Sequence, residues 1–308
     1  TTYSRILAYY FVNAPFMSHE ILKWDAFKLV RNISDWEIQV VVTSPPYNIW
    51  KSYERKQPLE EYLTPYYELA KELHRVITDT WSLFWEVGNY IQDWEVFPLD
   101  IYFYDIFKTA GFKLRNRIIW HFEHGLHASK RLSWRYESIL WFTKWDNYQF
   151  NLDSIRVPSK YPWKLHFKWP NKGKPSWNPL WKNPSDLWKL INQDWEKEIW
   201  DIPNVKANHP EKTNHPCQFP IELVQRCILA TSNEWDVVLD PFLWAWSSIL
   251  AALMHNRRWI WFEMDDLYIQ STKARIWELQ EWKLKFRPLW KPVHQPSWKE
   301  KISINPFQ

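Results

Sequence analysis

The sequence predicts an α/β fold with a mostly parallel central sheet that is interrupted by a long insertion. Residues 1–122 alternate apolar, β-branched runs with segments of helical period, and residues 206–290 do so again. That alternation is typical of βαβ units. Residues 123–205 lack it and are basic, proline-rich and aromatic. We therefore expect one Rossmann-like domain made of two parts, with 123–205 inserted between them and 291–308 as a loosely held tail.

Four segments of the first part have recognisable periods. Ile38 to Val42 is rich in β-branched residues and predicts a buried strand. Leu59 to about Thr78 has the apolar spacing of a helix. The apolar runs Ser82 to Val87 and Arg117 to Trp120 predict further strands. Strands joined through helices are what a parallel sheet requires.

The second part repeats the pattern over a shorter distance, without forming an internal repeat of the first. The expected helices are Ile221 to Thr231, Ser247 to His255 and Leu267 to about Glu281, and the expected strands are Val237 to Leu239 and Trp259 to Phe262. These elements extend the same predicted sheet.

Composition and cysteine content limit where the protein works. No apolar stretch approaches the about 18 residues of a membrane span, so we expect a soluble protein that does not enter a membrane. Residues 1–14 lack the basic start and apolar core of a secretory signal. Cys217 and Cys227 are the only cysteines, which indicates a reducing compartment without disulfides. Together these features predict a cytoplasmic protein.

Positive charge is concentrated in the insertion. No acidic residue lies between Asp153 and Asp186, whereas seven basic ones do, and subtracting them from the net charge of +4 leaves −3 for the rest. They are Arg156, Lys160, Lys164, Lys168, Lys172, Lys174 and Lys182. Six aromatic residues and six prolines are interleaved with them. This mixture predicts a surface that follows a phosphate backbone and stacks on bases; a solvated flexible loop is the alternative.

Glycine is scarce in the chain and tryptophan is abundant. At an average usage of about 7%, a chain of this length would contain roughly 22 glycines. It has 4 glycines and 26 tryptophans. Trp36, Trp94, Trp145 and Trp235 follow or separate Asp, Asn, Lys and Glu residues, at positions where turns usually need glycine. We interpret the pattern as a broad replacement of glycine by tryptophan.

The segment Thr43-Ser44-Pro45-Pro46-Tyr47 directly follows the predicted strand Ile38 to Val42. Two prolines cannot continue a strand, so the chain must leave the sheet at Ser44, and ligands bind at such strand ends in open α/β sheets. Proline rings hold the Ser44 and Pro45 carbonyls as fixed acceptors, and the Tyr47 ring can stack on a planar ligand. The segment indicates a pocket for a flat base with an amino group; a proline-terminated turn is the alternative.

A second motif follows the predicted strand Val237 to Leu239 and begins the next helix. It is Asp240-Pro241-Phe242-Leu243-Trp244-Ala245-Trp246-Ser247-Ser248. With glycines at 244 and 246 it would form a tight turn in which the backbone can approach a nucleoside. Glu263 ends the next strand, where a carboxylate can accept both hydroxyls of a ribose. Each feature alone also fits an ordinary strand-end turn.

Together these motifs resemble the DNA amino-methyltransferases that use S-adenosylmethionine, in the permuted (beta) subgroup whose catalytic motif precedes the cofactor motif. The resemblance covers about residues 22–280. It includes a third segment, Asn214-His215-Pro216-Cys217-Gln218-Phe219-Pro220, before the cofactor strand. It implies a Rossmann-like methyltransferase fold, S-adenosylmethionine as cofactor, and 123–205 as the target-recognition region.

The resemblance also implies roles for single residues. Ser44 and the Pro45 carbonyl would accept hydrogen bonds from the target amino group while Tyr47 stacks on the flipped base. The implied catalytic motif is Ser44, Pro45, Pro46 and Tyr47. The implied cofactor-binding residues are His215, Gln218, Phe219, Asp240, Pro241, Phe242, Trp244, Trp246, Ser247, Ser248 and Glu263. The implied DNA-binding residues are Lys160, Lys164, Lys168, Lys172, Lys174 and Lys182. Serine at position 44 is similar to members that methylate cytosine N4, and adenine N6 is the alternative.

Several tryptophans depart from that family's pattern. Indoles at Trp244 and Trp246 would occupy space where the backbone must meet the cofactor, and Trp261 would crowd the adenosine pocket. We therefore predict that this chain binds the cofactor poorly. A DNA-binding protein with impaired catalysis is accordingly the second functional class.

Double-stranded DNA is the expected partner, with a cognate restriction endonuclease as a biological partner and a homodimer as an open alternative. A small-molecule or RNA methyltransferase is less favoured, because it leaves the basic insertion unexplained. His121, His124 and His127 recur at every third position, but Glu123 and Gly125 disfavour a helix there. We expect no metal site.

Overall fold

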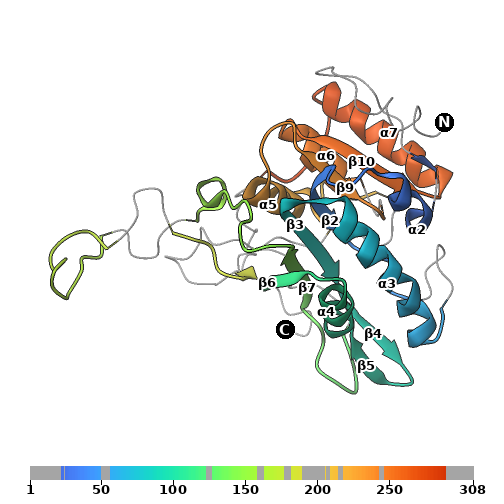
Figure 1. Cartoon of the computed structure of the whole chain (residues 1–308), viewed down its shortest axis with the longest axis horizontal. Coiled ribbons are helices and arrows are strands. Elements are labelled where there is room, and N and C mark those ends of the chain that lie inside the picture. The colour runs from blue at the N-terminus through green and yellow to red at the C-terminus, as the bar shows by residue number, and fades with distance from the viewer. Residues whose placement is uncertain are drawn as a thin grey trace, which may run out of the picture.

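The computed structural model describes residues 22–23, 25–49, 56–122, 127–157, 163–176, 182–188, 205, 209–213, 218–242 and 246–288. Eight strands form one sheet in the order β1-β10-β9-β2-β3-β7-β6-β8, and β4 and β5 form a separate hairpin (Figure 1). The strands are β1 Leu22–Lys23, β2 Ile38–Thr43, β3 Ile77–Val87, β4 Asn89–Gln92, β5 Glu95–Pro98, β6 Lys113–His121, β7 Tyr136–Thr143, β8 Leu187–Trp188, β9 Val237–Asp240 and β10 Arg258–Glu263. The helices are α2 Ala26–Leu29, α3 Leu59–Val76, α4 Leu99–Thr109, α5 Ile221–Thr231, α6 Ser247–Met254 and α7 Asp266–Gln280, with 3-10 turns η1 Val30–Asn32 and η2 Leu152–Ile155.

The middle of the sheet is parallel. β2 lies between β9 and β3 and runs parallel to both, and β10 and β1 continue the parallel arrangement beyond β9. On the other side β7 runs antiparallel to β3 and to β6. The predicted α/β fold with a mostly parallel sheet is confirmed.

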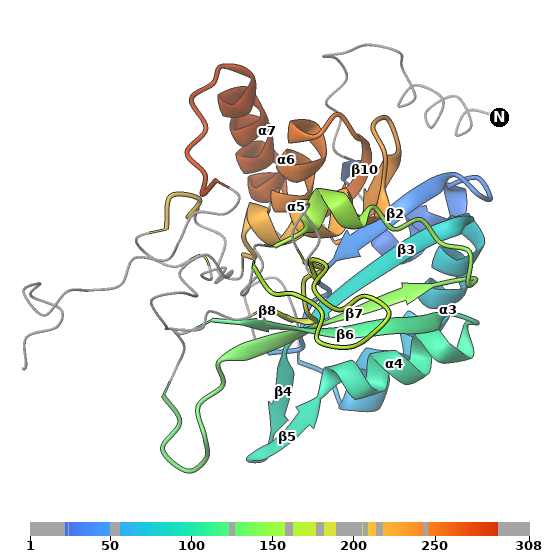
Figure 2. The same cartoon turned by 90° about the vertical axis from the view of Figure 1, so that its left-hand side faces the viewer.

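Helices cover both faces of this sheet. Figure 2 shows α3 and α4 together on one face, and α5, α6 and α7 grouped on the other. Strands buried on both faces have near-continuous apolar sequences. Accordingly, every residue of β2 except Gln39 is buried. The two predicted parts of the domain thus contribute neighbouring strands, β2 from the first and β9 from the second.

Two boundaries differ from the sequence prediction. The helix expected to extend to about Thr78 ends at Val76, because β3 begins at Ile77 and continues through the predicted strand segment to Val87. Strand β7 lies within residues 123–205, where no part of the sheet was expected. Part of that range is therefore a central strand, and the target-recognition role of the remainder stays a prediction.

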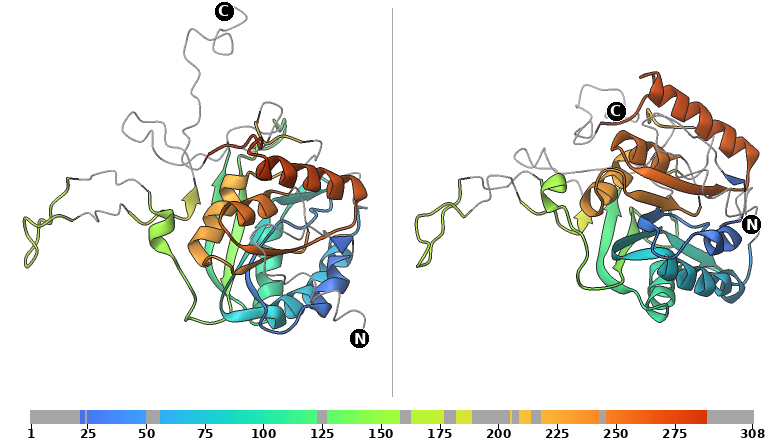
Figure 3. Two further views of the ribbon diagram at one scale, coloured as in Figure 1. Left: turned by 90° about the horizontal axis from the view of Figure 1, so that it is seen from above. Right: turned by 45° about the horizontal axis from the view of Figure 1, so that its top comes forward.

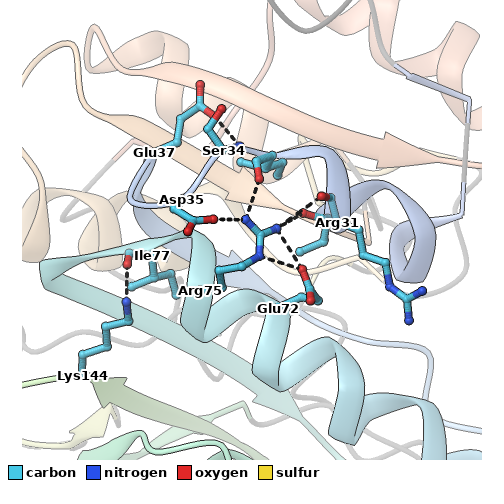
Figure 4. Close-up of polar contacts among 10 residues, drawn as sticks. Arg31, Ser34, Asp35, Glu37, Glu72, Arg75, Ile77 and Lys144 are labelled. Carbon is cyan, nitrogen blue, oxygen red and sulfur yellow. Dashed lines mark hydrogen bonds and ion pairs between the residues drawn. The ribbon is translucent and has the colours of Figure 1, made fainter. Parts of the chain in front are cut away.

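One guanidinium group fixes the chain just before β2. Arg75, in the last turn of α3, donates to the carbonyls of Val30 and Ile33 and forms ion pairs with Asp35 and Glu72 (Figure 4). Buried carbonyls at a helix end need such donors. The contact ties α3 to η1 and so sets where β2 enters the sheet.

The basic insertion includes a segment that reaches away from the sheet. Residues 163–176 project from the body of the molecule in Figures 1 and 3. Backbone hydrogen bonds close this segment on itself, from His166 N to Lys174 O and from Ser176 N to Lys164 O. All of its residues are exposed. Its lysines and aromatic rings are therefore available to another molecule.

Candidate functional site

The carboxyl ends of β2 and β9 bring the two sequence motifs together. Thr43 Oγ1, at the end of β2, donates to Asp240 Oδ1 over 2.5 Å. Asp240 also accepts from Ser248 Oγ at 2.6 Å and from Phe242 N at 3.1 Å. Both carboxylate oxygens are thus bonded to protein donors. Asp240 acts as the link between the first motif and the loop that begins α6.

The environment of Asp240 explains why this link is rigid. Its side chain is buried, and burial raises the pKa of the carboxyl to about 6, although the three donors oppose the shift. A buried carboxyl group can stay ionised at neutral pH when hydrogen-bond donors surround both of its oxygens.

The first motif forms a buried turn after β2. Ser44 is 1% exposed, Pro45 is buried, and Pro46 is partly buried. Tyr62 of α3 donates to the Pro46 carbonyl at 2.5 Å. Within the described residues no donor reaches the Pro45 carbonyl. An acceptor fixed at a strand end and left open in this way suits a hydrogen bond from a bound amino group.

Tyr47 is held by its hydroxyl. That hydroxyl lies 2.9 Å from Ser44 Oγ and donates to Glu86 Oε2 at 2.6 Å. Burial, the charge of Glu86 and that of Glu137 raise the pKa of Tyr47 well above its usual value, so the phenol stays protonated. Its ring is 8% exposed. The predicted stacking role of Tyr47 stays a prediction.

Sequence analysis missed Glu86 and Glu137, which lie behind the first motif. Glu86 is near the end of β3 and is 5% exposed, and Glu137 lies on the neighbouring β7. One signal was available: Glu86 is the single charged residue in the apolar run from Ser82 to Val87. A charged side chain is rarely buried without a partner. Glu137 gave no comparable signal, because β7 was not predicted.

Trp246 lies at the start of α6 in a conformation suited to glycine. Its φ is 48° and its ψ is −5°, in the left-handed region. Among the described residues no acceptor reaches its buried indole nitrogen. The Arg275 guanidinium lies 4.4 Å from its ring. The left-handed backbone is consistent with the interpretation that tryptophan replaces a glycine at position 246, and the indole is folded into the protein beside α7.

A second tryptophan lies against the same helix. Trp261 of β10 is 1% exposed, and its indole nitrogen donates to Ser248 Oγ at 3.1 Å. Its ring centroid is 4.2 Å from that of Trp259. Indoles therefore occupy the space between β10 and the first turn of α6.

The remaining predicted cofactor residues are divided between the interior and the strand ends. Phe219 is buried, and its carbonyl accepts from Ser247 Oγ at 2.7 Å. Gln218 donates to the Glu211 carbonyl at 2.7 Å. Pro241 is buried, and the Phe242 ring packs edge-on against Trp85 in the core. These residues are thus held by contacts within the protein.

Glu263 ends β10 with one oxygen still open. Its Oε1 accepts from Met264 N at 2.7 Å and from Asp265 N at 2.8 Å, and no described residue donates to its Oε2. Burial raises the pKa of the carboxyl to about 7. An open carboxylate oxygen beside a strand end can accept a hydroxyl of a ligand.

Three predicted site residues lie outside the described residues: His215, Trp244 and Lys160. The other predicted DNA-binding lysines, Lys164, Lys168, Lys172, Lys174 and Lys182, are all exposed. Trp163, Phe167 and Trp169 lie among them with exposed fractions of 82%, 78% and 82%. Exposed rings beside exposed lysines match the predicted stacking and phosphate-binding surface.

Within the described stretches, no group of three or more His, Cys, Asp or Glu side chains is arranged to hold a metal ion. None of the helices found there is long and apolar enough to cross a membrane.

Comparison with known proteins assigns the family. The model of the N6/N4 DNA methylase family matches residues 38–274. The chain belongs to this family. The type II methyltransferase M.BglII of Bacillus subtilis is 42% identical to it over 252 residues, which cover 82% of this chain and 67% of that protein. The DNA adenine methyltransferase YhdJ of Escherichia coli is 29% identical over 263 residues, 83% of this chain and 82% of that protein.

A solved structure has the same fold. The cytosine-N4-specific PvuII DNA methyltransferase superposes with a TM-score of 0.63 at 17% identity, covering 87% of this chain and 94% of that one. At this identity the likeness extends to the fold alone. The resemblance noted from the sequence motifs is confirmed, and the chain is an amino-methyltransferase of the N4/N6 type.

Proposed function

We propose that the chain transfers a methyl group from S-adenosylmethionine to the exocyclic amino group of a base that is flipped out of DNA. The bond between Thr43 and Asp240 carries this proposal, because it holds the target motif and the loop before α6 at one edge of the sheet. In-line transfer needs the two reactants fixed against each other, and positioning supplies much of the rate.

The residues present fit the cofactor in part. Glu263 offers an open oxygen to ribose hydroxyls, and the Phe242 ring flanks the strand end. Trp246 does not fit, because its indole replaces the bare backbone that a nucleoside would approach. When bound, S-adenosylmethionine supplies an electrophilic methyl group. In a chain that carries tryptophan at position 246, this misfit also favours a second candidate function, a DNA-binding protein with impaired catalysis.

Cytosine N4 is the proposed target atom. Ser44 stands at the first position of the catalytic motif, as in members that methylate cytosine. Adenine N6 is the alternative, in line with the name of YhdJ. The exposed lysines of 163–176 would bind the phosphates of double-stranded DNA.

The biological setting follows from the relatives. M.BglII is named as a type II methyltransferase, which favours a cognate restriction endonuclease as partner of this chain. The basic surface and the family both favour DNA over RNA or small molecules as substrate.

Methyl transfer from labelled cofactor to mixed-sequence DNA tests the proposal. Label recovered as N4-methylcytosine supports it, and N6-methyladenine selects the alternative base. DNA retained at low salt and released at high salt, without incorporation of label, supports the binding protein instead.

A further inference from the structure

A chain of hydrogen bonds runs from Ser44 into the protein. Ser44 Oγ is 2.9 Å from the Tyr47 hydroxyl, which donates its single hydrogen to Glu86 Oε2 at 2.6 Å. All three side chains are at most 8% exposed. The direction of each bond in this chain therefore depends on the charge of Glu86 and not on solvent.

The direction of the chain determines what Ser44 offers to a ligand. Since the Tyr47 hydrogen is used by Glu86, Ser44 must donate in the bond between the two hydroxyls. The Ser44 hydroxyl also lies near the Glu86 carboxylate, toward which it can only donate. In both arrangements the Ser44 hydrogen points inward. The lone pairs of Oγ are left to accept from the target amino group.

A second carboxyl group lies against Glu86. The side chain of Glu137 lies close enough to that of Glu86 for the two carboxyl groups to interact, and they can share a hydrogen bond only when one of them is protonated. Glu86 Oε1 is buried, and no N–H or hydroxyl among the described residues reaches it. A β-carbon added at Gly88 would lie 3.4 Å from Glu137 Oε1 and 3.2 Å from the Tyr47 ring. Glu137 and the Tyr47 ring thus both border Gly88.

Burial and mutual repulsion both favour one proton in this pair. The pKa of Glu137 is raised well above its usual value, first by burial and then by the charge of Glu86. Burial raises the pKa of Glu86 as well, but hydrogen bonds from Tyr47 and Ser44 lower it. The proton therefore resides mainly on Glu137, and Glu86 remains the carboxylate that accepts from Tyr47.

We propose that Glu86 and Glu137 hold one proton between them and, through Tyr47, fix the Ser44 hydroxyl as a hydrogen-bond acceptor for the target amino group. This inference rests on the proposed function. Glu86 and Glu137 are positioning residues here, because they act through Tyr47 and Ser44. A serine hydroxyl would otherwise be free to donate, and a donor cannot bind an amino group through its hydrogens.

Infrared spectroscopy of the chain itself tests the shared proton without any need for activity. At a pH just high enough to ionise the carboxyls of Glu211 and Glu263, whose pKa values are raised to about 7, these two groups no longer contribute a protonated-carboxyl band. We expect one such band to remain and to be lost in Glu137→Gln. The exposed Glu95→Gln variant is the control and should retain the band. Absence of the band in the parent chain, or its survival in Glu137→Gln, overturns the proposal.

Methyl-transfer kinetics test the consequence for Ser44. Glu86→Gln keeps the size of the side chain but can donate to Tyr47, so it should lower kcat about 100-fold and leave KM for DNA unchanged. Glu137→Gln still donates to Glu86, so its loss of kcat should be smaller than that of Glu86→Gln. In the parent chain, loss of the shared proton at alkaline pH should lower kcat, and this decrease should be absent in Glu137→Gln. Equal losses in the two variants at every pH overturn the proposal. A parent chain without any transfer refutes the proposed function, and the infrared result then stands alone.

A second inference comes from backbone conformation. Eight described residues other than glycine have φ between 48° and 71°, and five of them are tryptophans: Trp36, Trp94, Trp235, Trp246 and Trp282. Three of the four turn tryptophans singled out in the sequence are in this set, and Trp145 is not. Left-handed conformations disfavour bulky side chains and suit glycine.

We infer that these five positions hold glycine in the cell that makes the protein. The codon that gives tryptophan at these positions in the standard genetic code would be translated as glycine in that cell. Trp141 is a contrasting case, since it stacks on Phe84 and donates from its indole to Ser82 Oγ at 2.9 Å. The gene should use one codon at the five positions and a different tryptophan codon at Trp141. A shared codon, or a peptide from the native protein with tryptophan at 246, overturns the inference.

Discussion

The hydrogen bond between Thr43 and Asp240 joins two halves of the site, a target half and a donor half. The two halves differ in how well their side chains suit the backbone conformation. In the target half, Ser44 to Tyr47 with Glu86 and Glu137, the Ser44 and Tyr47 hydroxyls are hydrogen-bonded, and the Pro45 carbonyl is an acceptor that no described residue reaches. In the donor half, Asp240 to Ser248 with Glu263, Trp246 combines a left-handed backbone with a buried indole nitrogen that donates to no described residue.

The difference shows that a fold can tolerate side chains that its function does not. Trp246 and Trp261 are both buried, so their indoles contribute packing, although the sequence motifs suggest that the cofactor needs a bare backbone at position 246. Stability and activity of this chain are therefore separate quantities, and substitutions can move them independently. The following predictions exploit that separation, in order of decreasing effect.

Removing the hydrogen bonds of Asp240, which link the two halves, should cause the largest loss of stability. Asp240→Ala leaves the Thr43 and Ser248 hydroxyls without their buried acceptor, so the free energy of unfolding should fall by about 2–4 kcal/mol. Asp236→Ala, at the other end of β9, removes one acceptor for Asn233 N and should cost less than about 1 kcal/mol. Urea unfolding measures both. Equal losses would show that Asp240 is not a link between the halves.

Charge removal on the projecting segment should weaken DNA binding and leave the donor half unaffected. The triple variant Lys164→Gln, Lys168→Gln, Lys174→Gln should lower DNA affinity at least about tenfold at low salt and reduce the salt slope by up to about 3. The control variant carries Lys71→Gln, Lys108→Gln and Lys273→Gln. Fluorescence anisotropy at several salt concentrations compares them. An equal effect of the control would place the DNA-binding surface elsewhere.

Cofactor affinity should depend on pH through Glu263. Ribose hydroxyls donate to the ionised carboxylate, and the pKa of the free group is raised to about 7. Affinity should thus rise as pH increases through 7, by about tenfold between pH 6 and pH 8. Calorimetry on the Trp246→Gly variant measures this, and Glu263→Gln should abolish the dependence. A cofactor affinity that does not change with pH in the Trp246→Gly variant contradicts the role of Glu263.

Two exposed tryptophans at the end of α7 should respond with opposite signs. Trp282 has a φ of 56° and is 96% exposed, so Trp282→Gly relieves strain at little loss of burial and should stabilise by about 1 kcal/mol. Trp277 is inside α7, so Trp277→Gly should destabilise by about 1 kcal/mol. Thermal unfolding compares the pair. If the two variants shift the unfolding temperature in the same direction, the explanation based on backbone conformation is wrong.

Periodicity was sufficient to predict most of the fold. Three predicted elements are found to within one or two residues of their expected bounds: Ile38 to Val42, Ile221 to Thr231 and Val237 to Leu239. The two strands among them, β2 and β9, were recognisable because burial on both faces leaves a continuous apolar sequence. Strand β7 was missed because it was included in the basic insertion, although it pairs with the preceding strand β6 and with β3.

The site was predictable where function depends on contiguous motifs. Ser44, Pro45 and Asp240 lie together because parallel strands place their carboxyl ends at one edge. Glu86 and Glu137 were not predicted, since their pairing depends on the antiparallel register of β3 and β7, which no local pattern records. Long-range register is a property of the folded sheet and not of either segment.

Calorimetric titration of S-adenosylmethionine tests the difference between the two halves most directly. The parent chain, confirmed by mass to contain 26 tryptophans, is compared with Trp246→Gly. We predict weak or undetectable binding to the parent and at least about tenfold tighter binding to the variant, because glycine restores a bare left-handed turn at the start of α6. Tight binding to the parent with no gain in the variant would contradict the account.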